Sequence, residues 1–341
     1  MGRAQLQAMA SSTFLPNITQ QLRPSVSKIW EARKASTIDK YCQALRKFFV
    51  FCKSNDIEVV LPLSSMILAN YLIFLSNTNG TKGATSSAVA GLKWFHSFIP
   101  GLNATNNPIN DDFISRISQS ENRNLAKLKS RKKPLSNEII KAILKKSNSD
   151  QNPTLLMIRN ALIPCMAYAL LMRHDEISHL NCSHISAEEQ GLKIFIPSSK
   201  TDTYRQGKFV FLSKDNVDLY NLFFKYLSMA NISIGQNHFL FAPIIFDLKR
   251  KIFSLQNKKL SYSVFNEVVK EAVSDLGLDP HEYGTHSCRS GGATDLAPYV
   301  SQFELLLSGR WADPRSLGSY VETPQERRFA ISRNFDLNSN A

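Results

Sequence analysis

The sequence predicts a mainly α-helical protein of two domains, with a small antiparallel β-sheet in the second. Apolar residues recur at helical spacing over most of the chain, whereas two short runs around residue 200 have the composition of strands. Between two regions rich in apolar residues lies a polar, strongly basic segment, 122–134. A chain of 341 residues, 43% of them hydrophobic, is long enough to form a core on each side of this segment.

The first domain, 24–121, is predicted to be a small helical bundle that follows a mobile, polar arm over 1–23. A first amphipathic helix begins near Ser36, and Pro62 with Ser64 introduces a second. A third helix and a shorter fourth follow. The residues expected on their apolar faces are Ile38, Tyr41, Cys42, Leu45, Phe48, Phe49, Cys52, Ile67, Leu68, Tyr71, Leu72, Leu75, Ala88, Val89, Leu92, Phe95, Phe98, Phe113, Ile114 and Ile117.

The second domain is expected over 135–322. Its first elements are a helix after Ser136, a buried helix within 155–172, strands over 192–197 and 208–212, and helices over 214–230 and 262–276. Lys200 would then lie at the edge of a β-hairpin. The apolar run 155–172 contains charged and polar residues and a proline, so it predicts a buried helix rather than a membrane span.

The segment 284–321 begins with a helix that carries an imidazole and a guanidinium. Thr285 is expected to cap this helix, and His286 and Arg289, three residues apart, leave it on the same face. Gly291 and Gly292 follow inside the helix, where glycine costs stability, so they indicate close approach by another backbone.

Two more short helices are predicted after the proline at position 298. Ser301 and Glu304 form a capping box for a helix that ends near Gly309, while Asp313 and Pro314 supply the cap and first residue of another. The segment therefore brings several chemically active side chains onto adjacent helices.

The order His286-x-x-Arg289, Gly309-Arg310-Trp311 and Tyr320 resembles the C-terminal signature of tyrosine recombinases, the family of lambda integrase, the Xer proteins and Cre recombinase. Most members have histidine where this chain has tryptophan, and Cre has tryptophan. The sequence RSGGAT followed by GRW is also similar to motifs in the recombinases of DIRS and Crypton mobile elements. The resemblance covers about 133–320 by motif and the helical bundle by arrangement only. It implies a C-shaped, two-domain clamp around DNA.

In this resemblance Arg173 and Arg289 clamp the scissile phosphate, because fixed guanidinium groups stabilise the charge that grows on its non-bridging oxygens. Without the resemblance, Arg173 would be taken as one half of a surface or helix-end ion pair with Glu176. The resemblance implies that Glu176 orients Arg173 or His286.

The resemblance assigns Tyr320 as the nucleophile that forms a 3′-phosphotyrosyl bond. Its anion is a better leaving group than an alkoxide, so an incoming 5′-hydroxyl can reverse the bond without ATP. Tyr320 alone has the family spacing from the tryptophan, although Tyr204, Tyr283 and Tyr299 are the nearest competitors and any one of them is most simply a structural tyrosine.

Three further roles are implied by the resemblance. Lys200 would protonate the leaving 5′-oxygen, although Lys193 and Lys208 are nearby alternatives. His286 would accept or relay the tyrosine proton or hydrogen-bond the phosphate. Trp311 would donate its indole N–H to a phosphate oxygen, or else simply pack against the tyrosine helix.

Charge indicates nucleic acid as the partner. The chain has 41 Lys and Arg against 28 Asp and Glu, a formal charge of +13. No basic amphipathic helix or lipid signal favours a membrane. The composition of the linker 122–134 fits a solvated connection or a nuclear localisation signal, and the resemblance implies that it also contacts DNA phosphates. Its basic residues are Arg123, Lys127, Lys129, Arg131, Lys132 and Lys133.

The function implied is site-specific DNA recombination through a Holliday junction by four protomers on two double-stranded sites, with no cofactor, metal or ATP. The tail 323–341 would dock into a neighbouring protomer through Phe329 and Ile331. A type IB topoisomerase and a catalytically silent DNA-binding protein derived from a recombinase are the alternatives. Five cysteines without metal-ligand spacing favour a reducing compartment, the nucleus or the cytoplasm and nucleoid, rather than secretion.

Overall fold

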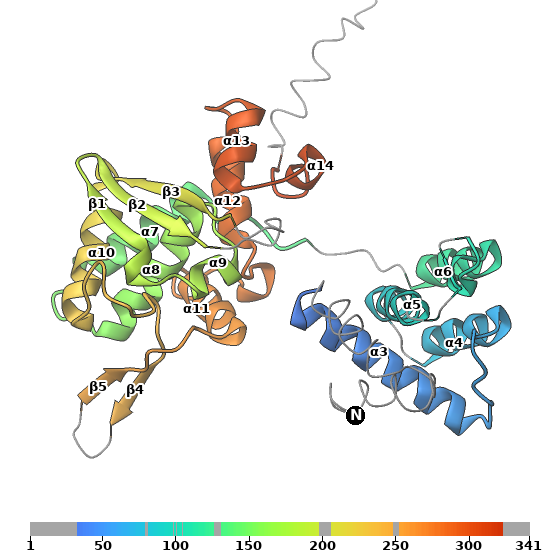
Figure 1. Cartoon of the computed structure of the whole chain (residues 1–341). Helices are drawn as coiled ribbons and strands as arrows, with labels where there is room; N and C mark the ends of the chain where they lie inside the picture. The colour runs from blue at the N-terminus through green and yellow to red at the C-terminus, as the bar shows by residue number, and fades with distance from the viewer. Residues whose placement is uncertain are drawn as a thin grey trace, which may run out of the picture. The chain divides into compact units, whose positions relative to one another are not determined.

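The computed structural model describes residues 33–78, 81–97, 99, 101–103, 105–125, 131–197, 206–247 and 252–322. Within these residues the chain is mainly helical with small antiparallel sheets, which confirms the fold class (Figure 1). The chain divides into two compact units, Met1–Lys129 and Ser130–Ala341, the first unit and the second unit. No helix in the described ranges is both long enough and apolar enough to cross a lipid bilayer.

The first unit is a helical bundle. Its described elements are α3 (Ala35–Ser54), α4 (Ser65–Asn77), α5 (Lys82–His96), the 3-10 turn η2 (Pro108–Asn110) and α6 (Asp112–Asn124). Ser64 and Thr81 cap α4 and α5 by accepting from the backbone N–H groups of Met66 and Ala84. Most of the expected apolar faces form one core, whereas Phe113 is 43% exposed and position 98 lies outside the described residues.

A buried histidine joins two segments of the first unit. His96 has no exposed surface, its Nε2 accepts from the backbone N–H of Leu63 at 3.2 Å, and its Nδ1 lies 2.8 Å from the carbonyl of Leu92. These contacts require the neutral ring with its proton on Nδ1. Burial lowers the pKa of His96, against the opposing effect of the Leu92 carbonyl.

The second unit contains the sheets and the remaining helices. Its helical elements are α7 (Asn137–Ser149), α8 (Leu155–Ala169), α9 (His174–Ser178), η3 (Cys182–His184), α10 (Val217–Ala230), α11 (Tyr262–Ser274), η4 (Pro280–Glu282), α12 (Ser287–Leu296), α13 (Gln302–Gly309) and α14 (Pro314–Leu317). Its strands are β1 (Ile185–Glu188), β2 (Gly191–Ile196), β3 (Lys208–Ser213), β4 (Ile244–Asp247) and β5 (Ile252–Leu255).

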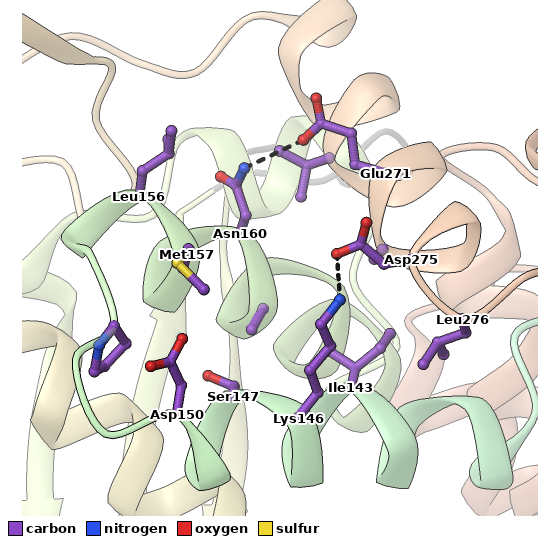
Figure 2. Close-up of a pocket in the computed structure, with 14 residues that line it drawn as sticks. Ile143, Lys146, Ser147, Asp150, Leu156, Met157, Asn160, Glu271, Asp275 and Leu276 are labelled. Atoms are coloured by element: carbon purple, nitrogen blue, oxygen red, sulfur yellow. Dashed lines mark hydrogen bonds and ion pairs between the residues drawn. The ribbon is translucent and has the colours of Figure 1, made fainter.

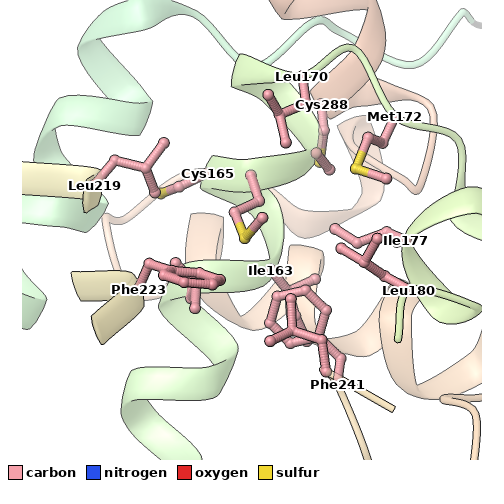
Figure 3. Packing of buried hydrophobic residues seen from close by; sticks show 14 of the residues in the cluster. Ile163, Cys165, Leu170, Met172, Ile177, Leu180, Leu219, Phe223, Phe241 and Cys288 are labelled. Carbon is pink, nitrogen blue, oxygen red and sulfur yellow. The ribbon is translucent and has the colours of Figure 1, made fainter. Parts of the chain in front are cut away.

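Helix α8 runs through the core of the second unit and contacts α7, α10, α11 and α12. Figure 3 shows Ile163 and Cys165 of α8 among apolar side chains from its neighbours, including Phe223 of α10 and Cys288 of α12. Full burial of each large apolar side chain contributes roughly 1.5–3 kcal/mol. The apolar run in the sequence is therefore the buried helix that was predicted, although it ends at Ala169.

The sheets differ from the prediction in number. Strands β2 and β3 form the expected hairpin, with Ile194 paired to Val210, but β1 adds a third antiparallel strand and β4 with β5 forms a separate two-stranded sheet. Only the first residue of β1 is buried, so its residues do not alternate between buried and exposed, and periodicity does not predict this strand.

Helix α12 packs without space for side chains at its two glycines. A Cβ on Gly291 would lie 1.8 Å from the carbonyl oxygen of Leu135, and a Cβ on Gly292 would lie 2.3 Å from the carbonyl oxygen of Tyr168. The predicted close approach by another backbone is confirmed. It brings α12 against the end of α8 and against the chain just before α7.

Replacing Gly291 by Ala is expected to destabilise the second unit by about 3 kcal/mol, because the new methyl overlaps backbone that must move. Gly318→Ala is the matched control, since its methyl meets only the Arg315 carbonyl at 3.7 Å. Urea unfolding of both variants tests this. Similar stabilities for the two would contradict the packing described here.

His96 is expected to make the first unit less stable as the pH falls. At pH values above the unfolded pKa of about 6.5 the ring is neutral in both states. Between that value and the lower folded pKa only the unfolded chain binds the proton, so stability falls by up to about 1.4 kcal/mol per pH unit. Hydrogen exchange of peptides from α3, α4 and α5 should show this loss in the wild type and not in His96→Gln. Equal pH dependence in both would refute it.

Candidate active site

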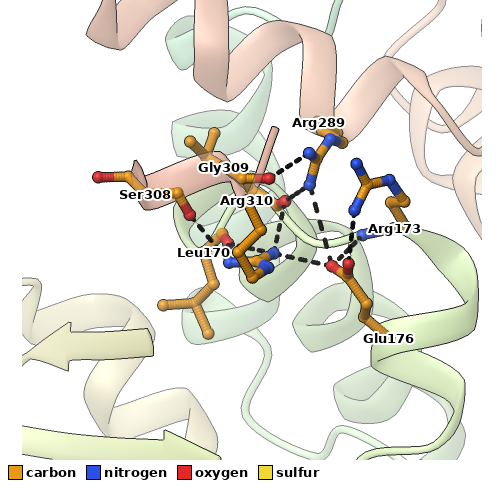
Figure 4. Close-up of polar contacts among 8 residues, drawn as sticks. Leu170, Arg173, Glu176, Arg289, Ser308, Gly309 and Arg310 are labelled. Atoms are coloured by element: carbon orange, nitrogen blue, oxygen red, sulfur yellow. Dashed lines mark hydrogen bonds and ion pairs between the residues drawn. The ribbon is translucent and has the colours of Figure 1, made fainter. Parts of the chain in front are cut away.

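A single buried carboxylate organises the candidate site. Glu176, on α9, accepts from the Nη1 of Arg173 at 2.7 Å and from the Nη2 of Arg310 at 2.8 Å, and its Oε2 lies 3.9 Å from the Nη1 of Arg289 (Figure 4). Burial alone would raise the pKa of Glu176, but the Arg310 guanidinium, the backbone N–H of Arg173 and the Arg289 guanidinium together outweigh burial, and the pKa lies below its usual value. Three guanidinium groups therefore share one ionised carboxylate, which leaves the cluster with a surplus of positive charge.

Arg289 is the most deeply buried of the three. Its side chain has no exposed surface, and its two terminal nitrogens donate to the carbonyls of Leu171 and Gly309. Burial, followed by repulsion from Arg173, lowers the pKa of Arg289 to about 9, which leaves it protonated at neutral pH.

Aromatic rings cover the Arg289 guanidinium. Its central carbon lies 4.1 Å from the ring of Trp311 and 5.3 Å from the ring of Tyr320, and the two rings are 5.2 Å apart. The indole N–H of Trp311 and the Nε of Arg289 are buried without a hydrogen-bond partner among the described residues. Within the described part of the chain, two donors beside the charge surplus thus lack an acceptor.

The Gly-Arg-Trp sequence has a steric basis. A Cβ on Gly309 would lie 1.6 Å from the indole ring of Trp311, so only glycine lets this ring fold back over the end of α13. The next residue, Arg310, ends the helix in the left-handed conformation with φ of 56°. Its side chain is buried, and no function was predicted for Arg310 from the sequence.

His286 and Tyr320 line a cavity of about 250 Å³ at the surface, together with Arg131, Lys132 and other residues of the second unit. The His286 and Tyr320 rings are 6.0 Å apart. His286 is exposed and occupies the N-cap position of α12. The prediction that Thr285 caps this helix is wrong. The first backbone hydrogen bond of α12 is accepted by the carbonyl of His286, and the Thr285 hydroxyl lies 3.3 Å from that of Tyr262.

The last residues of the basic linker contact η4, the 3-10 turn that precedes α12. Lys132 donates to the carbonyl of His281, and Lys133 forms a 2.6 Å ion pair with Glu282. Arg123 lies in the last turn of α6, in the first unit. Positions 127 and 129 lie outside the described residues.

The structure therefore brings together Arg173, Glu176, His286, Arg289, Trp311 and Tyr320. Of the two partners expected for Glu176, Arg173 is the one that it hydrogen-bonds. Lys200 and the tail 323–341 lie outside the described residues. The alternative Lys193 lies over the ring of Phe209, on the sheet.

A second cavity, of about 290 Å³, lies between α7, α8 and α11 (Figure 2). Apolar side chains such as Leu156 and Met157 line it, and Asp275 pairs with Lys146 at its rim. None of the residues predicted for the site contributes to it. We therefore assign the candidate active site to the cavity at His286 and Tyr320.

A helical unit with small antiparallel sheets, in which a histidine, a tryptophan and a tyrosine lie beside a cluster of arginines, is typical of the class of tyrosine recombinases. The sequence model of the phage integrase family matches residues 133–305, just over half of the chain, and the chain belongs to this family.

Relatives of known sequence and structure extend over most of the chain. An integrase/recombinase xerD homolog from Selenomonas ruminantium is 22% identical over 299 residues, 86% of this chain and 84% of its own length. XerH recombinase in a post-cleavage complex with a palindromic difH substrate has a TM-score of 0.62 and 16% identity, covering 97% of this chain and 89% of XerH. A lambda integrase dimer bound to a COC′ core site has a TM-score of 0.55 and 14% identity, and the match covers 99% of this chain and 98% of the lambda integrase chain. At these identities the structures support the fold alone.

Thr294 of α12 holds the backbone that directly follows the Tyr320 side chain. Its Oγ1 accepts from the N–H of Glu322 at 3.0 Å and donates to the carbonyl of Tyr320 at 3.4 Å. No local pattern singles out this threonine, because its partners lie 26 and 28 residues further along the chain.

Thr294→Val is expected to loosen the Tyr320 segment, because valine has the same shape but makes neither hydrogen bond. Loss of about 1 kcal/mol corresponds to roughly 5-fold faster hydrogen exchange at the Glu322 amide. Thr294→Ser keeps the hydroxyl and should exchange like the wild type. Unchanged exchange in the valine variant would rule out this anchor.

Proposed function

We propose that the protein is a site-specific DNA recombinase that cleaves and rejoins DNA through a covalent 3′-phosphotyrosyl intermediate on Tyr320. One observation carries the proposal: the Tyr320 ring lies against a guanidinium of a buried cluster whose positive charge exceeds its negative charge. A phosphodiester is an anion whose transition state gains charge on the non-bridging oxygens, which such a cluster stabilises.

In the proposed reaction the Tyr320 oxygen forms a bond to phosphorus as the bond from phosphorus to the 5′-oxygen breaks. His286, 6.0 Å away between ring centres, accepts or relays the phenol proton. Lys200 would protonate the departing 5′-oxygen. Rejoining reverses these steps, so one phosphoester bond is exchanged for another and no ATP is needed.

Arg173 and Arg289 are assigned to the phosphate, with Glu176 orienting Arg173 through their 2.7 Å contact. The Arg289 side chain has no exposed surface, so neighbouring groups must move before a phosphate can reach it. Its Nε–H, which has no acceptor among the described residues, can donate to a phosphate without the loss of either carbonyl partner. The indole N–H of Trp311, which has no acceptor among the described residues, supports its assignment as a further donor.

Double-stranded DNA as the partner is supported by the formal charge of +13 and by Arg131 and Lys132 at the cavity. Membership of the integrase family supports strand exchange through a Holliday junction by four protomers on two sites. Relaxation of supercoiled DNA by the same chemistry would not need that assembly.

Tyr320→Phe is expected to abolish covalent attachment while changing DNA affinity less than about 3-fold, because only the nucleophilic oxygen is removed. The measurement uses nicked DNA from the flanks of the protein's own gene, followed by denaturing gels and peptide mapping. Tyr299→Phe is the control, since this tyrosine is 85% exposed and outside the site.

An adduct that maps to Tyr320 in the wild type and persists in Tyr299→Phe supports the proposal. An adduct that survives Tyr320→Phe would disprove the assigned nucleophile. Intact binding without any adduct on flanking or supercoiled DNA would favour a catalytically silent DNA-binding protein. A two-site assay then separates recombination from relaxation.

A further inference from the structure

Arg310 occupies a backbone position that favours glycine. With φ of 56° it ends α13 in the left-handed conformation, which a residue with a Cβ adopts at a cost. A long side chain there also loses rotamer freedom when it is buried. The contacts of its guanidinium must therefore compensate for both.

The Arg310 guanidinium contacts three segments of the second unit (Figure 4). It donates to the carbonyl of Ser308 at 2.9 Å and to that of Leu171 at 2.9 Å, with longer contacts to the carbonyl of Leu170. Its Nη2 also donates to the Oε2 of Glu176 at 2.8 Å. It thus joins the end of α13 to the end of α8 and to α9.

Arg310 and Arg289 approach the same atom at different distances. The Oε2 of Glu176 lies 2.8 Å from the Nη2 of Arg310 but 3.9 Å from the Nη1 of Arg289, which is beyond hydrogen-bond length. The other carboxylate oxygen is held by Arg173. Both oxygens of the carboxylate are therefore engaged by arginines other than Arg289.

We propose that Arg310 is a positioning residue that occupies the Glu176 carboxylate and so keeps Arg289 available to an anionic phosphate. A guanidinium hydrogen-bonded to a carboxylate attracts a second anion less, because the two negative charges repel each other. Without Arg310, a shift of about 1 Å would bring Arg289 into hydrogen-bond contact with Glu176. This inference rests on the proposed function, since it concerns the same phosphate.

Arg310→Gly isolates the contribution of the side chain, because glycine suits the left-handed backbone. Strand cleavage should slow on the order of 10-fold or more, while DNA affinity stays within about 3-fold. Arg310→Lys keeps one charge on Glu176 and should recover part of the rate. Glu176→Gln combined with Arg310→Gly removes the carboxylate that would capture Arg289, and should be faster than Arg310→Gly alone.

A methylphosphonate at the scissile position separates this role from a purely structural one, because the methyl group replaces a charged non-bridging oxygen. If Arg310 acts through the charge available to the phosphate, the defect of Arg310→Gly shrinks on this substrate. An equal defect on phosphate and methylphosphonate, or a double variant slower than the single one, would overturn the proposal.

Inorganic phosphate provides a measurement that does not depend on cleavage. At constant ionic strength, phosphate should raise the Tm of the wild type and of Arg310→Lys, and raise that of Arg310→Gly less. Equal rises in the wild type and Arg310→Gly, or no rise in any protein, would count against the proposal. A phosphate-dependent rise in a wild type that forms no DNA adduct would refute the proposed function and leave the role of Arg310 intact.

Discussion

A carboxylate buried among three guanidinium groups must stay ionised, and each guanidinium needs acceptors for its N–H groups, because an isolated buried ion costs several kcal/mol. Glu176 and the carbonyls at the end of α8 meet most of this demand, although the Nε–H of Arg289 has no acceptor among the described residues. The partners come from α8, α9, α12 and α13, so these four elements are fixed relative to one another at one point. The apolar core alone would not specify that arrangement, because apolar contacts have no direction.

Three glycines allow the charged groups to meet. Gly291 and Gly292 bring α12 against backbone carbonyls, which places Arg289 beneath the end of α8, and Gly309 lets the indole of Trp311 fold back over it. A larger residue at position 291 or 292 would push α12 away from these carbonyls, and one at position 309 would displace the indole. The charged groups can therefore be buried together only because the backbones pack closely at these glycines.

Much of the fold follows from local sequence rules. The capping box of Ser301 and Glu304 and the cap at Asp313 lie where predicted, because such hydrogen bonds involve only neighbouring residues. Strands β4 and β5 were missed because segments of four residues are too short for alternation to show. Arg310 and Glu176 are 134 residues apart in the sequence, so local patterns cannot predict their contact. The left-handed backbone at position 310 would itself favour glycine over arginine. The convergence of Arg173, Arg289 and Tyr320 was expected only because the spacing of the motif resembles a known family.

The chain ahead of α7 is attached directly to the segment that carries His286 and Arg289. The N–H of Lys133 donates to the carbonyl of Glu282 at 2.7 Å, and the N–H of Leu135 donates to that of Ser287 at 2.9 Å, while the Lys133 ammonium pairs with Glu282. Residues 133–135 therefore act as a tether with little slack. Leu135 is also a buried member of the apolar core, so the chain that follows the linker joins the core and the first turn of α12 at one residue. The end of the linker and the helix that carries Arg289 are thus connected through the backbone itself.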